Sequence, residues 1–279
     1  MSLKEIAQAT LSILEAGQYV SNTGKIVVFA DAQSAAVQGT RLYTPEQGAA
    51  LLAKPLAESD SNSFPSRPAI EVTDETTQTA ARRLVQNEGC ANLVLLNYAS
   101  ARNPGGGFIN GAKAQEEDLS RCSGLYPCLL TQPTYYQVNR AQDSLLYTDH
   151  VIYSPKVPWF RTHSRELIED VFLASVITAP APNAGQVLRR NPQARPEIES
   201  ALRRRAGIVL AIARAQGHRS LLLGAWGCGV FRNDPDQVAD AFGQWLAAPQ
   251  FQGCFDRVVF GVYDPTQDQR ILQAFQDRF

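Results

Sequence analysis

The stretch "ANLVLLNYASARNPGGGFINGAKAQEEDL", residues 91–119, joins three different local patterns. It begins with a nearly continuous apolar run, 91–99, which is typical of a strand that is covered on both faces. Three consecutive glycines follow, and a further pattern that begins near Ala114 predicts a helix. A strand, a glycine-rich loop and a helix in this order are typical of α/β proteins that bind ligands beyond the ends of their strands.

The same alternation of short apolar runs and longer helical patterns continues along the chain. It predicts strands over 25–30, 69–74, 170–179, 220–226 and 256–263, and an edge pair of strands, interrupted by prolines, over 144–160. It predicts helices over 44–53, 75–89, 195–218, 234–248 and 266–279. We interpret the proline-rich segment 177–196 as a long surface loop, and the three arginines at 203–205 as part of a solvated helix face.

These elements predict one α/β domain over residues 1–279. The N-terminal sequence has the pattern of an amphipathic helix, so we expect residues 1–22 to form a helical extension of that domain. An acidic residue within its apolar pattern argues against a secretory signal peptide.

Composition limits the partners of the protein. The chain has 279 residues, 44% of them hydrophobic, and a formal net charge of -1. A nearly neutral chain lacks the broad basic surface that duplex nucleic acid requires. No apolar run is long enough to span a bilayer. We therefore expect a monomer that binds neither duplex nucleic acid nor a membrane.

Cysteines and histidines give no indication of a metal site. The five cysteines are odd in number, and no pair has the close spacing of a zinc knuckle. The three histidines stand apart from other ligand-type residues. We expect reduced thiols in a cytoplasmic protein that needs neither a metal nor a cofactor.

Two glycine-rich loops follow predicted strands, "NPGGGFING" at 103–111 and "GAWGCGVF" at 224–231. Glycine lets backbone amides approach a ligand closely, so two such loops at strand ends could clasp a diphosphate between them. Neither loop matches a P-loop, and in "GCGVFR" Arg232 replaces the third glycine of a dinucleotide fingerprint. Each loop taken alone would be compatible with a simple tight turn.

Glu116 and Glu117 lie in the first turn of the helix that begins near Ala114. Acidic residues are favoured there by the helix dipole, so a solvated helix start is one interpretation of the pair. The glycine loop just upstream favours another interpretation, in which both carboxylates face a bound ligand.

The run "NYASARNPGGGFINGAKAQEEDLSRCSGLYP", 97–127, resembles the small bacterial type of poly(ADP-ribose) glycohydrolase, whose signature combines a triple glycine with a pair of glutamates. The segment "GAWGCGVFRNDP", 224–235, is similar to the phosphate-binding loop of that family, and the resemblance covers roughly residues 90–265. It implies a macrodomain-like, three-layer α/β/α fold with a mixed central sheet. It also implies hydrolysis of the ribose–ribose O-glycosidic bonds of poly(ADP-ribose).

The resemblance implies a role for each matching residue. Glu117 matches the catalytic acid, and Glu116 matches the carboxylate that holds ribose hydroxyls. Phe231 would pack on the ribose next to the scissile bond, which Asn103 would also contact. The full set of implied substrate-binding residues is Asn103, Gly105, Gly106, Gly107, Gln115, Gly227, Cys228, Gly229, Val230 and Phe231.

A single carboxyl can perform the implied chemistry. The leaving oxygen must be protonated and a water then activated around an oxocarbenium-like state. Glu117 could do both in succession if the substrate diphosphate stabilises the positive charge on the sugar. The helix N-terminus lowers the pKa of such a carboxyl, whereas burial, Glu116 and the diphosphate raise it. We expect the raising effects to prevail once substrate is bound.

Three other functions are alternatives to this one. A macrodomain that only binds ADP-ribose needs both glycine loops but not the glutamate pair. A hydrolase that removes single ADP-ribose groups from proteins could use the same pocket. A nucleotide-dependent NTPase is disfavoured, because no hydroxyl follows the lysine of "GGGFINGAK".

The resemblance also implies a biological setting and a mode of cutting. It implies ADP-ribosylated proteins as partners, reversal of ADP-ribosylation and a place in the DNA damage response. It further implies release of ADP-ribose mainly from the chain end. Residues 263–269 and the last helix are the candidates to close the adenosine end of the site; the alternative is a plain turn that Thr266 caps into that helix.

Overall fold

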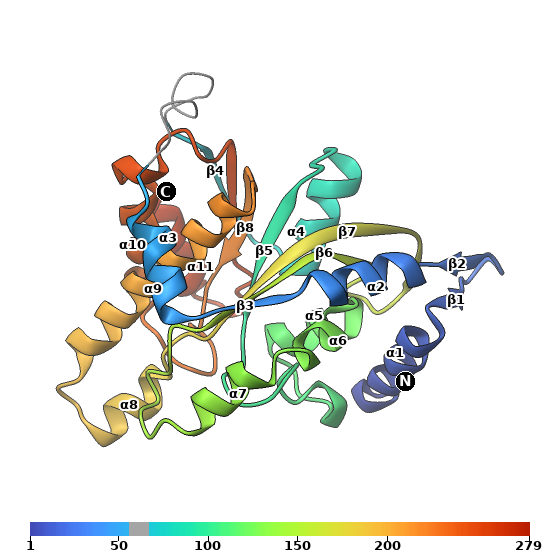
Figure 1. The fold of residues 1–279 in the computed structure, drawn as a ribbon, viewed down its shortest axis with the longest axis horizontal. Coiled ribbons are helices and arrows are strands. Elements are labelled where there is room, and N and C mark those ends of the chain that lie inside the picture. Colours follow the sequence, from blue (N-terminus) through green and yellow to red (C-terminus); the bar gives the residue numbers. More distant parts are fainter. Residues whose placement is uncertain (56–66) are drawn as a thin grey trace.

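A computed structural model describes residues 1–55 and 67–279, and within them a mixed sheet forms the centre of the protein (Figure 1). Its strands are β3 (Arg41–Tyr43), β4 (Ala69–Thr73), β5 (Leu93–Tyr98), β6 (Val151–Arg161), β7 (Leu167–Ala179), β8 (Ser220–Gly224) and β9 (Arg257–Gly261). The strand order is β3-β6-β7-β5-β8-β9-β4. Strands β4, β5, β7, β8 and β9 are parallel, whereas β6 is antiparallel to both of its neighbours.

Helices cover both faces of this sheet. One layer contains α3 (Pro45–Ala53), α8 (Ala184–Arg190), α9 (Arg195–Ala215), α10 (Pro235–Leu246) and α11 (Arg270–Arg278). The other contains α2 (Ala30–Gly39), α4 (Thr77–Arg82), α5 (Gln115–Cys122), α6 (Leu125–Leu130) and α7 (Pro133–Arg140). This arrangement confirms the three-layer α/β/α fold with a mixed sheet.

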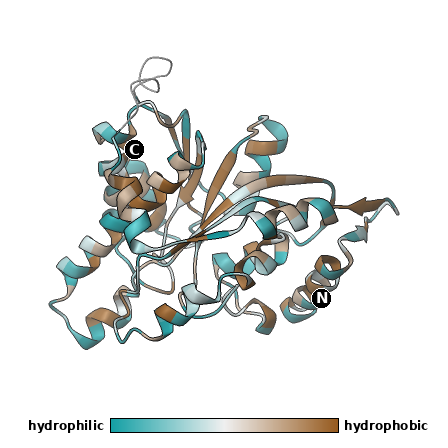
Figure 2. Cartoon of the chain, viewed as in Figure 1, coloured by the Kyte–Doolittle hydropathy of each residue, from teal (hydrophilic) through white to brown (hydrophobic). Residues whose placement is uncertain are grey.

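The buried strands explain why the sheet needs two covers. In β5, Val94 and Leu96 point into one apolar cluster, while Leu93 and Leu95 point into the other. Successive side chains of a strand face opposite sides, so a continuous apolar run must be covered on both. In Figure 2 the hydrophobic strands accordingly lie between helices whose outer faces are more hydrophilic.

The N-terminal extension is helical only in its first part. Helix α1 (Leu3–Ala16) ends at Gly17, whose φ of +63° suits glycine and whose added Cβ would lie 2.6 Å from that of Ala30. A hairpin of β1 (Gln18–Val20) and β2 (Ile26–Val28) follows. The helical extension predicted over 1–22 therefore ends at Ala16, and the strand predicted over 25–30 is shorter because α2 begins at Ala30.

Most of the other predicted elements are confirmed within a few residues. The helix predicted over 44–53 is α3, and Thr44 and Gln47 form a capping box at its start. The helix predicted over 75–89 begins at Thr77, continues as a π-helical turn over Arg83–Asn87 and ends at Gly89 with φ +69°.

Two predicted segments differ from the structure. Residues 151–161 form the single strand β6, which lies inside the sheet and is not an edge pair. Its two prolines are tolerated because β3 pairs only with Val151–Tyr153 and because the register with β7 shifts between Ser154 and Val157. The segment predicted as a surface loop, 177–196, contains α8, and α6 and α7 were not predicted at all.

The arginines at 203–205 do not share one solvated face. The Arg205 side chain is fully buried, and its Nε donates to Asp149 Oδ1 at 3.0 Å. Its other nitrogens donate to backbone carbonyls of the segments that precede β6 and follow β7. A buried guanidinium is costly unless it is paired and hydrogen-bonded, and these acceptors satisfy it.

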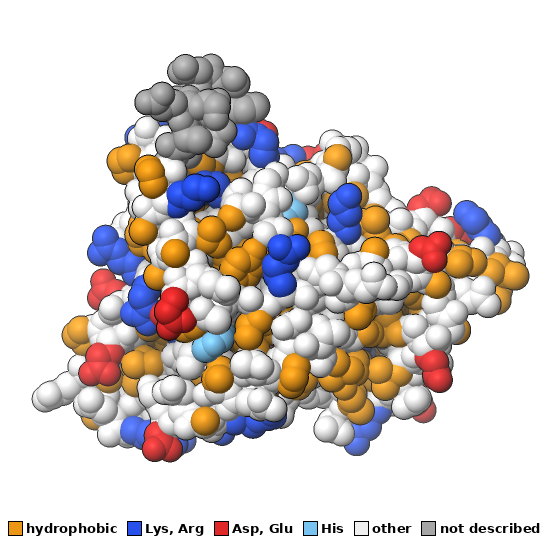
Figure 3. All heavy atoms as spheres, viewed as in Figure 1, with side chains coloured by type: hydrophobic (Ala, Val, Ile, Leu, Met, Phe, Trp, Pro, Cys, Tyr) orange, Lys and Arg blue, Asp and Glu red, His pale blue; other side chains and the backbone are white. Residues whose placement is uncertain are grey.

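The surface carries dispersed charges. In Figure 3 positive and negative side chains are interspersed over the face shown. The described part of the chain contains no helix with the length and apolarity needed to cross a membrane.

A close backbone contact holds the centre of the sheet together and generates a stability prediction. A Cβ added to Gly224 in β8 would lie 2.1 Å from the Tyr98 hydroxyl and 2.3 Å from the Gly261 carbonyl oxygen. We expect Gly224→Ala to lower the free energy of unfolding by about 1–3 kcal/mol, measured by urea denaturation. Gly229→Ala is the matched control, because its Cβ would meet nothing within 4 Å. Equal stability of the two variants would contradict the packing argument.

Candidate active site

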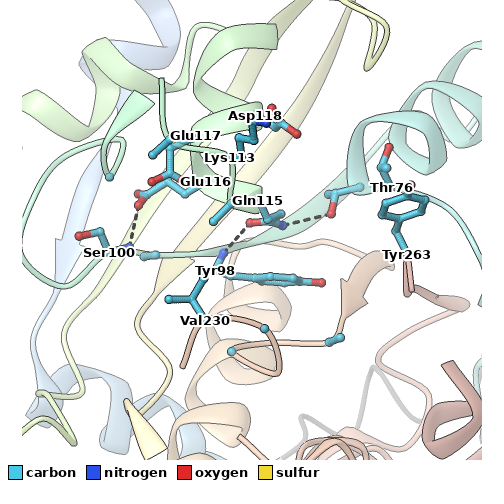
Figure 4. Close-up of a pocket in the computed structure, with 18 of the residues that line it drawn as sticks. Thr76, Tyr98, Ser100, Lys113, Gln115, Glu116, Glu117, Asp118, Val230 and Tyr263 are labelled. Atoms are coloured by element: carbon cyan, nitrogen blue, oxygen red, sulfur yellow. Dashed lines mark hydrogen bonds between the residues drawn. The ribbon is translucent and has the colours of Figure 1, made fainter. Parts of the chain in front are cut away.

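A cleft of about 720 Å³ opens where the parallel strands end. Each of the five strands contributes to its lining through the segment that follows it, for example Ser100 after β5, Ala225 after β8 and Tyr263 after β9. Ligands of α/β sheets bind in this position, and the volume lies within the usual range of small-molecule sites. Figure 4 shows Glu116 and Glu117 on one wall, with Val230 across the cleft.

Glu116 is held on both of its carboxylate oxygens. It is 2% exposed, and its Oε2 accepts a hydrogen bond from the Ser100 amide at 2.7 Å (Figure 4). Its Oε1 accepts from Asn97 Nδ2 at 3.1 Å. Burial raises the pKa of Glu116 to about 8, since it outweighs these hydrogen bonds, and the charge of Glu117 adds to the rise.

Glu117 is held on one oxygen only. Its Oε1 accepts a hydrogen bond from the Gly107 amide at 2.9 Å. Its Oε2 is buried and has no hydrogen-bond partner among the described residues. Glu117 lines the cleft, so the carboxylate of the pair with an unsatisfied oxygen belongs to a residue that borders the ligand space.

The triple glycine lies directly against the two carboxylates. A Cβ on Gly106 would lie 2.3 Å from Glu117 Oε1 and 3.3 Å from Glu116 Oε2, and its φ is +58°. Gly107 lines the cleft as well, whereas Gly105 is buried against Phe108 and does not. A side chain at Gly106 would therefore displace the carboxylates before it reached any phosphate, which the sequence alone could not reveal.

Gln115 fastens the start of α5 to the end of β5. Its Oε1 accepts from the Tyr98 amide at 2.8 Å (Figure 4). Its Nε2 donates to Thr77 Oγ1 at 3.1 Å and to the Leu96 carbonyl at 2.9 Å. Both amide protons of Gln115 are thus engaged by protein acceptors. Asn103, in contrast, is exposed at the cleft.

The second loop supplies backbone donors. The amides of Gly227, Gly229, Val230 and Phe231 make no hydrogen bond within the described residues, and all four residues line the cleft. Unpaired amides that converge on a hollow form a site for an anion. Cys228 differs, because its amide donates to the Ala225 carbonyl, and the residue borders a separate cavity behind the loop and packs against the hydrophobic core.

The structure thus brings ten of the twelve predicted site residues together at one cleft, all except Gly105 and Cys228. Sequence reasoning missed Asn97 and Ser100, which hold Glu116. Their signal was available, since both are polar residues at the carboxyl end of an apolar strand. It also missed His163, which reaches the cleft from the turn after β6 and would not be found by any local pattern.

The far end of the cleft is formed by the segment after β9. Tyr263 and Ile271 line it. Asp264 accepts hydrogen bonds from Thr266 and from the Ile271 amide, at 2.8 Å, and so fixes the turn before α11. The N-cap of α11 is Gln269, so the alternative in which Thr266 caps this helix is wrong. The Asp264 carboxylate instead accepts from two amides of the first turn, those of Ile271 and Leu272.

No group of three or more His, Cys, Asp or Glu side chains in residues 1–55 and 67–279 is arranged to hold a metal ion.

Comparisons with known proteins identify the relatives of this site. The family model of the microbial-type PARG (poly(ADP-ribose) glycohydrolase) catalytic domain matches residues 7–162, which is more than half of the chain. The chain belongs to this family. The match includes the triple glycine and both glutamates.

Solved structures extend the likeness to the second loop. The poly(ADP-ribose) glycohydrolase from Thermomonospora curvata is 46% identical, with a TM-score of 0.93 and 99% of each chain covered. The same enzyme bound to the inhibitor ADP-HPD has a TM-score of 0.89 at 46% identity and 99% coverage of each chain. The Deinococcus radiodurans enzyme in complex with ADP-ribose is 47% identical, with a TM-score of 0.79, and 88% of this chain and 96% of that chain are covered. No curated protein matches significantly.

The protein is therefore a poly(ADP-ribose) glycohydrolase with a macrodomain-like fold. The interpretation of Glu116 and Glu117 as a solvated helix start is wrong, since both glutamates are less than 10% exposed.

The raised pKa of Glu116 makes the stability of this glycohydrolase depend on pH. Unfolding returns the carboxyl from a pKa of about 8 to its ordinary value of 4.5. Between these values the folded state binds more protons, so the contribution of Glu116 is fully favourable below pH 4.5 and is lost as pH rises through about 8. We expect Glu116→Gln, which cannot ionise, to gain stability relative to wild type at pH 8 compared with pH 5.

Urea denaturation at both pH values measures this difference. Glu166→Gln, which changes an exposed glutamate in the turn between β6 and β7, is the control and should follow wild type. A Glu116→Gln variant with the pH dependence of wild type would show that Glu116 is ionised in the folded protein at both values.

Proposed function

We propose that Glu117 is the acid and base of the reaction, within a single catalytic domain that releases ADP-ribose mainly from the polymer end. The observation that carries this role is the asymmetry of the pair. Both oxygens of Glu116 accept protein hydrogen bonds, whereas Glu117 lines the cleft and its buried Oε2 has no partner among the described residues. A proton can therefore pass between Glu117 Oε2 and a substrate oxygen without breaking an existing bond.

The two loops would hold the diphosphate between them. Unpaired amides of Gly227, Gly229, Val230 and Phe231 are donors of the kind that bind phosphate oxygens, and Gly107 faces them from the other wall. Relatives solved with ADP-ribose and with ADP-HPD support ADP-ribose as the ligand. In this arrangement Phe231 packs on the ribose next to the scissile bond, and Asn103 contacts the same sugar.

The reaction then proceeds in two steps. In the first, protonated Glu117 gives its proton to the departing ribose oxygen as the bond to the anomeric carbon breaks, and the diphosphate stabilises the oxocarbenium-like sugar. In the second, the Glu117 carboxylate takes a proton from water, whose oxygen bonds to the anomeric carbon. One water is consumed, and Glu117 is left protonated for the next cycle.

Glu116 supports this cycle by position and charge. With its pKa raised to about 8 by burial, it is largely neutral near pH 7. A neutral neighbour lets the Glu117 carboxylate form without adjacent like charge. Its carboxyl is held by Ser100 and Asn97 at the point where ribose hydroxyls would bind.

The cutting mode depends on the adenosine end of the cleft. Tyr263 and Ile271 line the cleft, and Asp264 fixes the segment between them, which supports assigning this segment to the adenosine end. A closed end would exclude the next unit of the polymer, which is attached at the adenosine ribose. A closed end of this kind would support chain-end cutting.

The cellular setting of the reaction is also part of the proposal. All five cysteines are free thiols, which suits the reducing cytoplasm. ADP-ribosylated proteins are the partners that carry the polymer, and reversal of that modification in the DNA damage response is the process it would serve. Removal of single ADP-ribose groups from proteins could use the same cleft, and assays on mono- and poly-modified protein separate the two activities.

Glu117→Gln tests the catalytic role. Gln retains an acceptor for the Gly107 amide but cannot exchange the proton, so we expect kcat on purified poly(ADP-ribose) to fall by about 10²–10⁴-fold or more. The Kd for ADP-ribose, measured by calorimetry, should change only a few-fold. Glu166→Gln again serves as the control, and wild-type turnover by Glu117→Gln would remove Glu117 from the mechanism.

The order of products tests the cutting mode. With long poly(ADP-ribose), we expect free ADP-ribose from the first time points, while the chains shorten gradually. Chromatography of samples taken early in the reaction measures both, with Glu117→Gln enzyme as the blank. Free oligomers that accumulate before ADP-ribose would show internal cutting and an open adenosine end.

A further inference from the structure

A second cavity, of about 320 Å³, lies on the outer side of the loop that faces the cleft. The loop 227–231 separates the two spaces. Gly229, Val230 and Phe231 line the cleft, whereas Cys228 and the following Arg232 line the second cavity. The two spaces therefore share one short wall of backbone, and an occupant of one lies close to an occupant of the other.

Three arginines give this cavity its charge. Arg195, Arg232 and Arg270 line it, all three are exposed, and none forms an ion pair within residues 1–55 and 67–279. Other arginines of the chain, such as Arg205 and Arg257, are paired with carboxylates. The acidic lining residue is Asp234, whose Oδ1 already accepts from the Asp236 amide at 3.1 Å.

The backbone adds to the positive potential. Arg195 is the first residue of α9, Arg270 is the first residue of α11, and Asp234 is the N-cap of α10. Three helices thus begin at this cavity, and the start of a helix carries partial positive charge. Figure 1 shows α8 and the start of α9 together at one end of the molecule.

A buried amide supplies an independent indication of a ligand. Asn233 lines the cavity and is 3% exposed. Its Nδ2 donates to the Pro182 and Gly227 carbonyls, at 2.8 and 3.1 Å. Its Oδ1 is buried without a partner among the described residues, so it remains an acceptor for a hydroxyl group.

We propose that this cavity is a second phosphate-binding site, which takes a phosphate ester next to a sugar hydroxyl. The arginines match the phosphate oxygens, since guanidinium groups bind phosphate in a fork, and Asn233 Oδ1 matches the hydroxyl. The identification of this ligand as a part of the poly(ADP-ribose) chain rests on the proposed function. Poly(ADP-ribose) repeats a diphosphate and ribose hydroxyls in every unit, so a chain engaged at Glu117 brings a further phosphate to the neighbourhood of the shared loop.

The double variant Arg195→Gln/Arg270→Gln tests the site and leaves the loop itself unchanged. In phosphate-free buffer we expect its KM for poly(ADP-ribose) to rise about tenfold or more, the size of effect that loss of charged hydrogen bonds produces. The slope of log KM against log salt should become less steep by roughly 0.7 per guanidinium removed. The Kd for ADP-ribose should stay within twofold of wild type, because the cleft is intact.

The control Arg41→Gln/Arg203→Gln removes the same charge from two exposed arginines that do not line the cavity. Inorganic phosphate is the second probe, titrated by calorimetry into enzyme whose cleft is saturated with ADP-ribose. The site is assigned to free phosphate if phosphate binding releases heat with wild-type enzyme but not with the Arg195→Gln/Arg270→Gln variant, and if the KM of the variant for poly(ADP-ribose) is unchanged. A raised KM assigns it to the polymer.

The proposal is overturned if the Arg195→Gln/Arg270→Gln variant matches the control in both measurements. Failure of the proposed function is a separate result. If the wild-type enzyme did not cut polymer, the phosphate titration would still decide whether the cavity binds phosphate.

Discussion

The passage of the glycine backbone over two carboxylates is the constraint on which this site depends. Gly106 has φ +58°, and no side chain fits there, since a Cβ would lie 2.3 Å from Glu117 Oε1. The close approach lets the Gly107 amide bind that oxygen and leaves Oε2 unpartnered. A residue with a Cβ would have to push the loop away, and Glu117 would lose the contact that orients it.

The site also requires that the glycine-rich loops after β5 and β8 face each other, and the sheet provides this arrangement. Gly224 lets β8 pack against the Tyr98 hydroxyl of β5 and the Gly261 carbonyl of β9. The ends of these strands therefore stay in close contact, and the segments after them open into one cleft. Gln115 then fixes the start of α5 to the end of β5, so the carboxylates keep their place relative to both loops.

Features of the fold and of the site could be predicted from the sequence where they depend on residues that are close together in the chain. The strand over 91–99, the helix at Gln115 and the glutamate pair follow from local patterns and from the triple glycine, so their arrangement was predictable. The burial of Arg205 was not, because its partner Asp149 lies 56 positions away. The position of Cys228 behind the loop, away from the cleft, likewise depends on the backbone path of the loop, which an alternation of glycines does not specify.

The two glutamates show how one helix start can hold carboxyl groups in different environments. Ser100 and Asn97 occupy both oxygens of Glu116, yet burial still raises its pKa to about 8, so it holds its position largely without charge. Glu117 keeps one oxygen without a hydrogen-bond partner among the described residues. The facing loop offers unpaired amides, so the cleft can neutralise a diphosphate by geometry although the chain has a net charge of -1. Backbone donors are fixed in direction, and this favours a ligand of one phosphate spacing over anions in general.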